Sequence, residues 1–267
     1  MSTTENEPGV QLTLDGPVAT ISLSRPAVLN AQTPQMWGAL RQIGKELPGD
    51  VRVVVVRGEG RAFSAGIDLS VASPGDKSSG VASAGRSGEF HLLASSADEV
   101  ALTRIEGYQE AFTWLRRPGI VSIAAVQGHA IGAGFQLALA CDLRVVADDA
   151  KFCMAEVSLG LVPDLGGTKP LYDLVGPARA LDLCVTGRRV GAAEADRMGL
   201  VNRLVPVAEL DIAVAELAAA VVAGNRDAVV EIKALIAGAG DRDLATQTRY
   251  EREAQLRRLR DLAGIGE

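Results

Sequence analysis

The sequence contains few of the residues that build metal centres or disulfide frameworks. Its two histidines, His91 and His129, are far apart and fit no ligand spacing, so we expect no metal site. Its three cysteines, Cys141, Cys153 and Cys184, stand in apolar contexts without a CxxC pair. We interpret them as reduced core thiols, which favours a cytoplasmic protein.

Several sequence patterns are also absent. No apolar run approaches the roughly 20 residues of a membrane span, and the polar start MSTTENEPG does not resemble a signal peptide. The net charge of -6 argues against a nucleic-acid surface, because phosphate binding requires a basic face. The glycine spacing does not match the GxGxxG of Rossmann-type dehydrogenases, and no GxxxxGK(S/T) motif occurs. We therefore expect no membrane partner, no nucleic-acid partner and no dinucleotide cofactor.

The first third of the chain alternates strand-like runs with helical ones. Residues 10–26 (VQLTLDGPVATISLSRP) predict a hairpin with its turn at 15–17. The run TPQMWGALRQIGKEL predicts a helix with Thr33 as its N-cap and Pro34 at its first position. The β-branched run VRVVVVRG (51–58) is typical of a strand buried on both faces. This alternation predicts an α/β fold.

Beyond this region, the Ser/Gly/Ala-rich residues 71–96 are interpreted as a mobile loop with short helical pieces. IVSIAAVQGHAI then predicts one buried strand, GAG a turn, FQLALAC a helix and DLRVVA another strand. From Asp164 onward the patterns are helical only, and they end in a charged helix from about Asp241 to Leu262. That helix is either a solvated face with salt bridges or an arm that packs on a neighbouring subunit.

Two short glycine-containing segments, SAGIDL (64–69) and IGAGF (131–135), each lie where a strand-like run gives way to a helical one. Such turns leave unpaired backbone N–H groups at a helix N-terminus, and glycine permits close approach of the backbone. If parallel strands bring the turns together, two N–H groups can donate to one carbonyl oxygen as an oxyanion hole. Either turn alone is also compatible with a purely structural role.

Two segments resemble the signature regions of the crotonase (enoyl-CoA hydratase/isomerase) superfamily: RAFSAGIDL (61–69) and GHAIGAGFQLALACDLRVVADDAKFCMAEVSLGLVPDLGGT (128–168). The resemblance extends through RPAVLNA (25–31) and residues 174–206, but not to residues 71–96. It implies a crotonase-like spiral of ββα repeats with a C-terminal helical region. Such proteins usually assemble as trimers or as dimers of trimers (hexamers).

On this resemblance, residues 1–200 form the spiral core that binds acyl-CoA, and 201–267 form a helical trimerisation region. Coenzyme A is then part of the substrate, and no separate cofactor is required. The oxyanion donors are the backbone N–H groups of Ile67 and Ala133. Candidate coenzyme A contacts are Arg25, Val28, Ala65, Asp68 and Leu69. Asp68 is alternatively a local cap or turn residue.

The acid–base residues depart from the pattern of the family's hydratases, which have two glutamates. The second glutamate corresponds to Glu156, but the first position holds Gln136, whose neutral amide cannot act as a general acid or base. A third candidate, Asp164, matches an acidic residue of the dienoyl-CoA isomerases, although those enzymes also have an aspartate at position 136. Asp164 is alternatively a helix cap.

Four functions follow from these residues. The favoured one is an enoyl-CoA isomerase in which Glu156 alone moves a proton. The alternatives are an enoyl-CoA hydratase in which Gln136 and Asp164 position water, a dienoyl-CoA isomerase that uses Glu156 and Asp164, and a non-catalytic acyl-CoA-binding protein.

Overall fold

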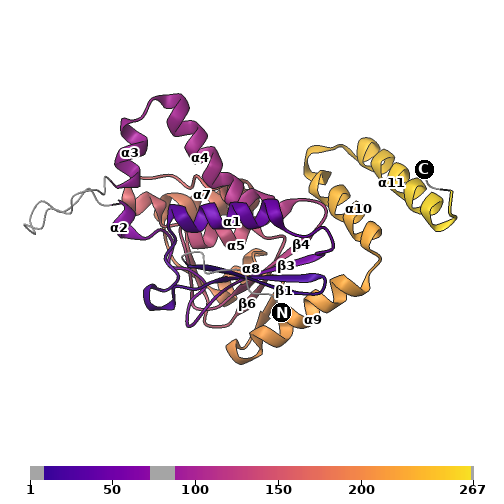
Figure 1. Ribbon diagram of the computed structural model, residues 1–267, viewed down its shortest axis with the longest axis horizontal. Coiled ribbons are helices and arrows are strands. Elements are labelled where there is room, and N and C mark those ends of the chain that lie inside the picture. Colours follow the sequence, from indigo (N-terminus) through magenta and orange to yellow (C-terminus); the bar gives the residue numbers. More distant parts are fainter. Residues whose placement is uncertain (1–8, 73–87, 266–267) are drawn as a thin grey trace, which may run out of the picture.

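The computed structural model describes residues 9–72 and 88–265, which form two sheets surrounded by helices (Figure 1). The larger sheet has the strand order β1-β2-β3-β4-β6-β9, and the smaller one the order β5-β7-β8. In the larger sheet β1 and β2 are antiparallel and the other pairs are parallel. The strands are β1 (Val10–Asp15), β2 (Val18–Leu23), β3 (Val53–Gly58), β4 (Val121–Val126), β5 (His129–Ile131), β6 (Leu143–Ala147), β7 (Lys151–Cys153), β8 (Val190–Gly191) and β9 (Arg203–Val205).

The helices pack around these sheets and continue beyond them at the C-terminal end (Figure 1). They are α1 (Pro34–Glu46), α2 (Leu69–Ala72), α3 (Glu89–Ser95), α4 (Asp98–Thr113), α5 (Ala133–Ala140), α6 (Thr168–Val175), α7 (Pro177–Thr186), α8 (Ala192–Met198), α9 (Leu210–Ala223), α10 (Arg226–Ala237) and α11 (Leu244–Leu262).

From β4 to β7, successive strands alternate between the two sheets. Strand β4 of the larger sheet is followed by β5 of the smaller sheet and then by α5. The next pair, β6 and β7, repeats this step before α6 and α7. This alternation confirms the predicted α/β spiral of ββα repeats with a helical C-terminal region.

The predicted elements of the first third are confirmed. Asp15 pairs with Val18 across the hairpin, whose turn contains Gly16 at φ 53°. Thr33 caps α1 by accepting a hydrogen bond from the Met36 N–H at 3.3 Å. Strand β3 is buried along almost its whole length because strands lie on both of its edges and helices cover both faces.

The stretch predicted as one strand, IVSIAAVQGHAI, forms two strands in different sheets, and that prediction was wrong. Gly128 makes the corner between β4 and β5 at φ 59°, and a Cβ there would lie 2.0 Å from the Arg61 carbonyl oxygen. Only glycine fits such a corner, so the continuous apolar run conceals a turn.

Two other predictions about the elements need correction. Helices are not the only elements after Asp164, because β8 and β9 add short strands to both sheets. Their two and three residues are too few to show a period. Helix α4 was not predicted at all. In the predicted loop, α2 and α3 are the expected helical pieces, and residues 73–87 lie outside the described residues.

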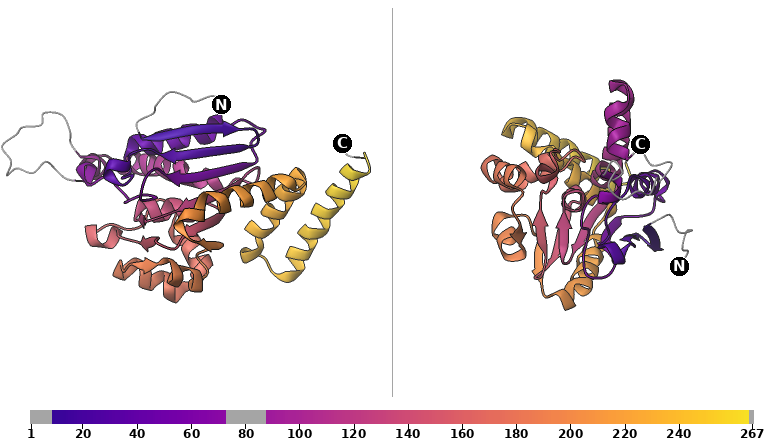
Figure 2. Two further views of the ribbon diagram at one scale, coloured as in Figure 1. Left: turned by 90° about the horizontal axis from the view of Figure 1, so that it is seen from below. Right: turned by 90° about the vertical axis from the view of Figure 1, so that its left-hand side faces the viewer.

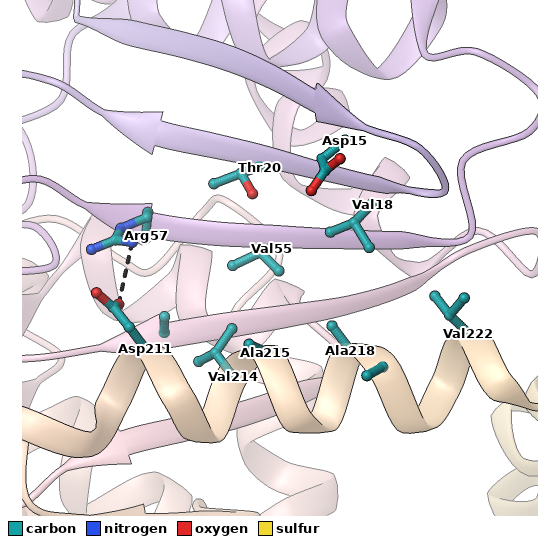
Figure 3. A pocket seen from close by; sticks show the side chains of 12 residues that line it. Asp15, Val18, Thr20, Val55, Arg57, Asp211, Val214, Ala215, Ala218 and Val222 are labelled. Atoms are coloured by element: carbon teal, nitrogen blue, oxygen red, sulfur yellow. Dashed lines mark ion pairs between the residues drawn. The ribbon is translucent and has the colours of Figure 1, made fainter. Parts of the chain in front are cut away.

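Helix α9 covers the face of the larger sheet that points away from the smaller one, and a cleft of about 350 Å³ separates it from β2 and β3 (Figure 3). The cleft persists because the helix presents small side chains there, among them Ala215 and Ala218. At one end Arg57 pairs with Asp211 at 3.2 Å. Its lining offers no histidine, cysteine or serine to act as a nucleophile or base.

Helices α10 and α11 form an arm that extends from the body of the molecule (Figures 1 and 2). The final helix begins at Leu244, with Asp243 as its N-cap, three residues later than predicted. None of the described helices is long and apolar enough to cross a membrane. The division at residue 200 stays a prediction; in the structure β9 and α9 pack on the larger sheet, and the arm begins after them.

Candidate active site

The two glycine-containing turns interlock at the end of the parallel strands. Ser64 forms a parallel bridge with Ala130, in which the Ser64 N–H donates to His129 O at 2.8 Å and Ser64 O accepts from the Ile131 N–H at 3.0 Å. A Cβ on Gly66 would lie 2.6 Å from the Ile131 carbonyl oxygen, and one on Gly134 would lie 2.5 Å from that of Ser64. The turns can therefore meet only because both positions are glycine.

This contact places the two predicted oxyanion donors beside each other. The Cβ position of Gly66 lies 3.7 Å from the Ala133 nitrogen, and Ile67 follows directly. Among the described residues, neither the Ile67 N–H nor the Ala133 N–H has a hydrogen-bond acceptor. Ala133 is also the first residue of α5, where the helix dipole favours negative charge. The two unpaired N–H groups therefore stay the predicted oxyanion hole.

A cavity of about 610 Å³ lies over these amides. Its lining is mainly apolar and includes seven of the predicted site residues, namely Ala65, Ile67, Leu69, Ala133, Gln136, Glu156 and Asp164. An apolar cavity with a few converging polar groups is typical of a small-molecule site.

Glu156 is the buried carboxylate of this cavity. It begins the 3-10 turn Glu156–Leu159 and is 8% exposed. Its Oε1 accepts a hydrogen bond of 2.7 Å from Nε2 of Gln136, whereas its buried Oε2 has no partner among the described residues. Burial raises the pKa of Glu156, the charge of Asp164 adds to this, and the hydrogen bond from Gln136 opposes it. A carboxylate with a raised pKa is a stronger base, and Oε2 is the oxygen of Glu156 that no described residue engages.

The Gln136 side chain is hydrogen-bonded through both its nitrogen and its oxygen. It is 1% exposed, and its Oε1 accepts from the backbone N–H groups of Leu165 and Gly167 at 2.9 and 3.2 Å. These two donors fix the amide so that its NH₂ group faces Glu156. Gln136 therefore orients Glu156 and the 165–167 backbone.

Asp164 lies on the cavity wall and does not cap a helix. Helix α6 begins four residues later, and its N-cap is Gly167, without a side-chain hydrogen bond. The interpretation of Asp164 as a helix cap was therefore wrong, because the 165–167 turn separates it from the helix. Neighbouring groups desolvate its carboxyl group and raise its pKa. Its backbone carbonyl accepts from Gln109 at 2.8 Å, which ties this wall to α4.

Of the five candidate coenzyme A contacts, Ala65 and Leu69 line the cavity, and the other three do not. Arg25 and Asp68 form a salt bridge of 2.9 Å, and Asp68 also accepts hydrogen bonds from the N–H and hydroxyl of Ser70 at 3.1 and 2.7 Å. Ser70 and Arg25 lower the pKa of Asp68. Asp68 thus makes the local turn contacts that its alternative interpretation predicted, and its contact with coenzyme A stays a prediction. Val28, which follows Arg25 closely in the sequence, has an exposed side chain.

One wall of the cavity was not predicted from the sequence. Trp37 of α1 and Tyr108 of α4 line it with ring centroids 4.9 Å apart. The Tyr108 hydroxyl contacts Glu89, and burial raises the pKa of Tyr108 to about 12. Ala101, Ile105 and Tyr108 recur at helical spacing on α4, and this period was the available signal.

The few cysteines and histidines give no sign of a further site among the described residues. Cys141 and Cys153 are buried and Cys184 is half-buried, all as free thiols. Among the described residues, no group of three or more His, Cys, Asp or Glu side chains is placed to hold a metal ion. His91 is exposed on α3, and His129 is partly buried on β5.

Comparison with known proteins places the chain in a family. The profile of the family described as enoyl-CoA hydratase/isomerase matches residues 14–111 and 92–260. A candidate enoyl-CoA hydratase from Thermobifida fusca YX, solved in complex with CoA, is 51% identical, with a TM-score of 0.86 over 96% of this chain and 95% of its own. The same protein in complex with acetoacetyl-CoA superposes with a TM-score of 0.87.

Two further relatives carry names that describe different reactions. A carnitinyl-CoA dehydratase from Salmonella arizonae is 36% identical over 93% of this chain and 87% of its own. A probable enoyl-CoA hydratase from Mycobacterium bovis is 35% identical over 73% of this chain and 68% of its own. By the profile match and these identities, the chain belongs to the enoyl-CoA hydratase/isomerase family.

Proposed function

We propose that the protein is an enoyl-CoA isomerase that moves a double bond within an acyl-CoA thioester, with Glu156 as its proton carrier. The observation that supports this most directly is the state of the two acid–base positions. Glu156 lines the cavity and its buried Oε2 has no hydrogen-bond partner among the described residues, whereas the Gln136 amide is hydrogen-bonded to Glu156 and to the 165–167 backbone. One ionisable carboxylate suffices for a 1,3-proton shift.

In this reaction the Glu156 carboxylate takes a proton from C2 of a 3-enoyl thioester. The electron pair of that C–H bond moves into the thioester carbonyl, and the resulting dienolate oxygen accepts hydrogen bonds from the Ile67 and Ala133 N–H groups. Glu156 then returns the proton to C4, which leaves a 2-enoyl thioester and restores the carboxylate. Nothing is consumed apart from the substrate, so coenzyme A serves only as the acyl carrier and no separate cofactor is required.

The first test is a panel of 2-enoyl, 3-enoyl and dienoyl thioesters of several chain lengths with the purified protein. We expect 3-hexenoyl-CoA to be isomerised, and the Glu156→Gln variant to lose at least a hundredfold in kcat, in line with the roughly 10²–10⁴-fold contribution of a general base. Near-normal turnover in that variant would show that Glu156 is not the proton carrier. Binding without turnover of any thioester would instead favour an acyl-CoA-binding protein.

The second candidate is hydration of a 2-enoyl thioester, and the position of Asp164 favours it. Asp164 lines the same cavity as Glu156, and its charge raises the pKa of Glu156. Water held between them would supply the hydroxyl group that hydration adds to C3. The names of the relatives also favour this reaction, and a dienoyl-CoA isomerase would use the same two carboxylates.

Restoring the missing acid distinguishes the two candidates. In Gln136→Glu, a carboxylate takes the place of an amide that now donates to Glu156 at 2.7 Å. Two carboxyl groups at this distance share a proton, which supplies the acid–base pair that hydration uses. We expect crotonyl-CoA hydration to rise in this variant. An unchanged hydration rate would mean that the cavity does not position water.

The remaining expectations concern binding and assembly. We propose that Arg25, Val28 and Asp68 contact the coenzyme A moiety outside the cavity, and that the protein acts in the cytoplasm. We also propose a homotrimer or hexamer, because the arm exposes large apolar side chains, including Ile232, Ile236 and Leu244. Light scattering of the purified protein tests the assembly.

A further inference from the structure

The arm is joined to the core by a buried lysine that the proposed reaction does not use. Lys233 lies on α10, and its side chain is 12% exposed. Its ammonium group donates to the carbonyl oxygens of Arg117 and Ile120 at 2.9 and 2.7 Å, and to Oδ2 of Asp142 at 2.6 Å. These three acceptors use all three donors of the ammonium group.

Asp142, which lies just beyond the end of α5, is held from a second side. Its Oδ2 also accepts a hydrogen bond from the backbone N–H of Ser122 at 2.8 Å, and the Ser122 hydroxyl shares its one hydrogen between Leu115 O at 2.8 Å and this Oδ2 at 3.1 Å. The Ser122 hydroxyl in turn accepts from the Asp142 N–H at 2.9 Å. Asp142 thus connects the start of β4 with the end of α5, and Lys233 balances its charge.

Two arginines contact the same end of α5. Arg116 donates to Leu139 O at 2.7 Å, and Arg144 donates to Cys141 O at 2.9 Å. Cations are favourable there because the carbonyl groups at a helix C-terminus carry partial negative charge. Of the three cations, Lys233 comes from the arm. Burial lowers its pKa, and the neighbouring Asp142 opposes that change.

The opposite end of α5 carries the Ala133 amide, and Gln136 lies one turn further on. The helix has eight residues, all buried, and spans about 12 Å. Buried elements are closely packed, so a shift at one end of so short a helix is transmitted to the other. We propose that Lys233 is a positioning residue, which fixes α5 through Asp142 and thereby directs the Ala133 N–H at the thioester oxygen. This inference rests on the proposed function, in which that N–H stabilises the enolate.

The experiment compares Lys233→Met with Arg52→Met. Arg52 holds the chain just before the arm, by donating to Val222 O at the end of α9 and to Gly224 O at 2.7 Å each, and among the described residues it makes no hydrogen bond to α5. The probe is acetoacetyl-CoA, whose bound enolate is measured by ultraviolet difference absorbance because its fraction reports oxyanion stabilisation. Turnover of 3-hexenoyl-CoA, the Kd for CoA and light scattering complete the measurements on each full-length protein.

We expect Lys233→Met to lower the enolate fraction, and to lower kcat about tenfold, since losing a whole oxyanion donor costs roughly 10²–10³-fold. The Kd for CoA and the assembly stay unchanged, and Arg52→Met retains the enolate fraction and kcat within about twofold. An unchanged enolate fraction in Lys233→Met, or an equal loss in both variants, overturns the positioning role.

Asp142→Asn is a milder variant, and it tests the same coupling if Lys233→Met does not fold. It retains an oxygen for Ser122 but removes the charge that Lys233 faces, and it is expected to lower the enolate fraction in the same way; an unchanged enolate fraction overturns the coupling. When Lys233→Met folds, the double variant should lose no more than either single variant, and additive losses overturn the coupling. If the wild-type protein binds acetoacetyl-CoA as its enolate but turns over no thioester, the proposed function fails while the positioning role is still measured.

Discussion

Nε2 of Gln136 lies 2.7 Å from Oε1 of Glu156, so an amide that cannot ionise lowers the basicity of the carboxylate beside it. The hydrogen bond lowers the pKa of Glu156 against the larger effect of burial, which raises it. Removing the donor in Gln136→Leu should therefore raise that pKa further. Since Glu156 must be deprotonated to take a proton from C2, activity is lost as pH falls through its pKa.

We accordingly expect the acidic limb of kcat/KM for 3-hexenoyl-CoA to lie above the usual glutamate range in the wild-type protein. In Gln136→Leu it should move to still higher pH, with activity retained on the alkaline side. The pH profiles of both proteins are the measurement. A limb that moves to lower pH would contradict the role of this hydrogen bond.

Asp164 acts on Glu156 in the opposite direction. Its charge raises the pKa of Glu156, although the two carboxylates share no hydrogen bond. In Asp164→Asn that charge is removed, so the acidic limb of kcat/KM should move to lower pH. If water positioning by Asp164 carries the reaction instead, the same variant will lose activity across the whole pH range, and the two results are easily distinguished.

The close contact between Gly134 and the Ser64 backbone predicts that replacing Gly134 by alanine lowers the free energy of unfolding. In Gly134→Ala the new methyl group would lie 2.5 Å from the Ser64 carbonyl oxygen, which is backbone and cannot rotate away. We expect about 1–3 kcal/mol of destabilisation, the usual cost of overpacking a core. Urea denaturation measures it.

The matched control is Gly38→Ala, in the exposed face of α1, where no atom lies within 4 Å of the new Cβ. Here alanine should stabilise the protein by roughly 0.5–1 kcal/mol, because glycine loses more backbone freedom on folding. Equal effects at the two positions would contradict the proposed close approach of the turns.

The sequence carried enough information for much of this arrangement. Periodicity and capping residues such as Thr33 predicted the N-terminal elements, and the glycines of both turns predicted a meeting of backbones. Long-range geometry could not be predicted in this way. The Gly128 corner is hidden in an apolar run, and β9 is too short for any period. The role of Gln136 depends on donors 29 and 31 residues away, at Leu165 and Gly167, that only the fold brings to it.

The oxyanion role of Ala133 can be tested by a substitution that removes its backbone N–H but leaves helix α5 intact. Ala133 is the first residue of α5, a position at which proline is tolerated because its missing N–H has no partner within the helix. Ala133→Pro should therefore fold and still bind CoA, but lose about 10²–10³-fold in kcat, the typical cost of removing one oxyanion donor.

The same change at Ala192 provides the control. Ala192 is the buried first residue of α8, also preceded by a glycine N-cap, and it does not line the cavity. Because Ala192→Pro removes an equivalent N–H, it reports the purely structural cost of the substitution through its melting temperature and kcat. A comparable loss of kcat in the two variants would mean that the Ala133 amide does not contact the reacting oxygen, whereas a loss confined to Ala133→Pro assigns the effect to that amide.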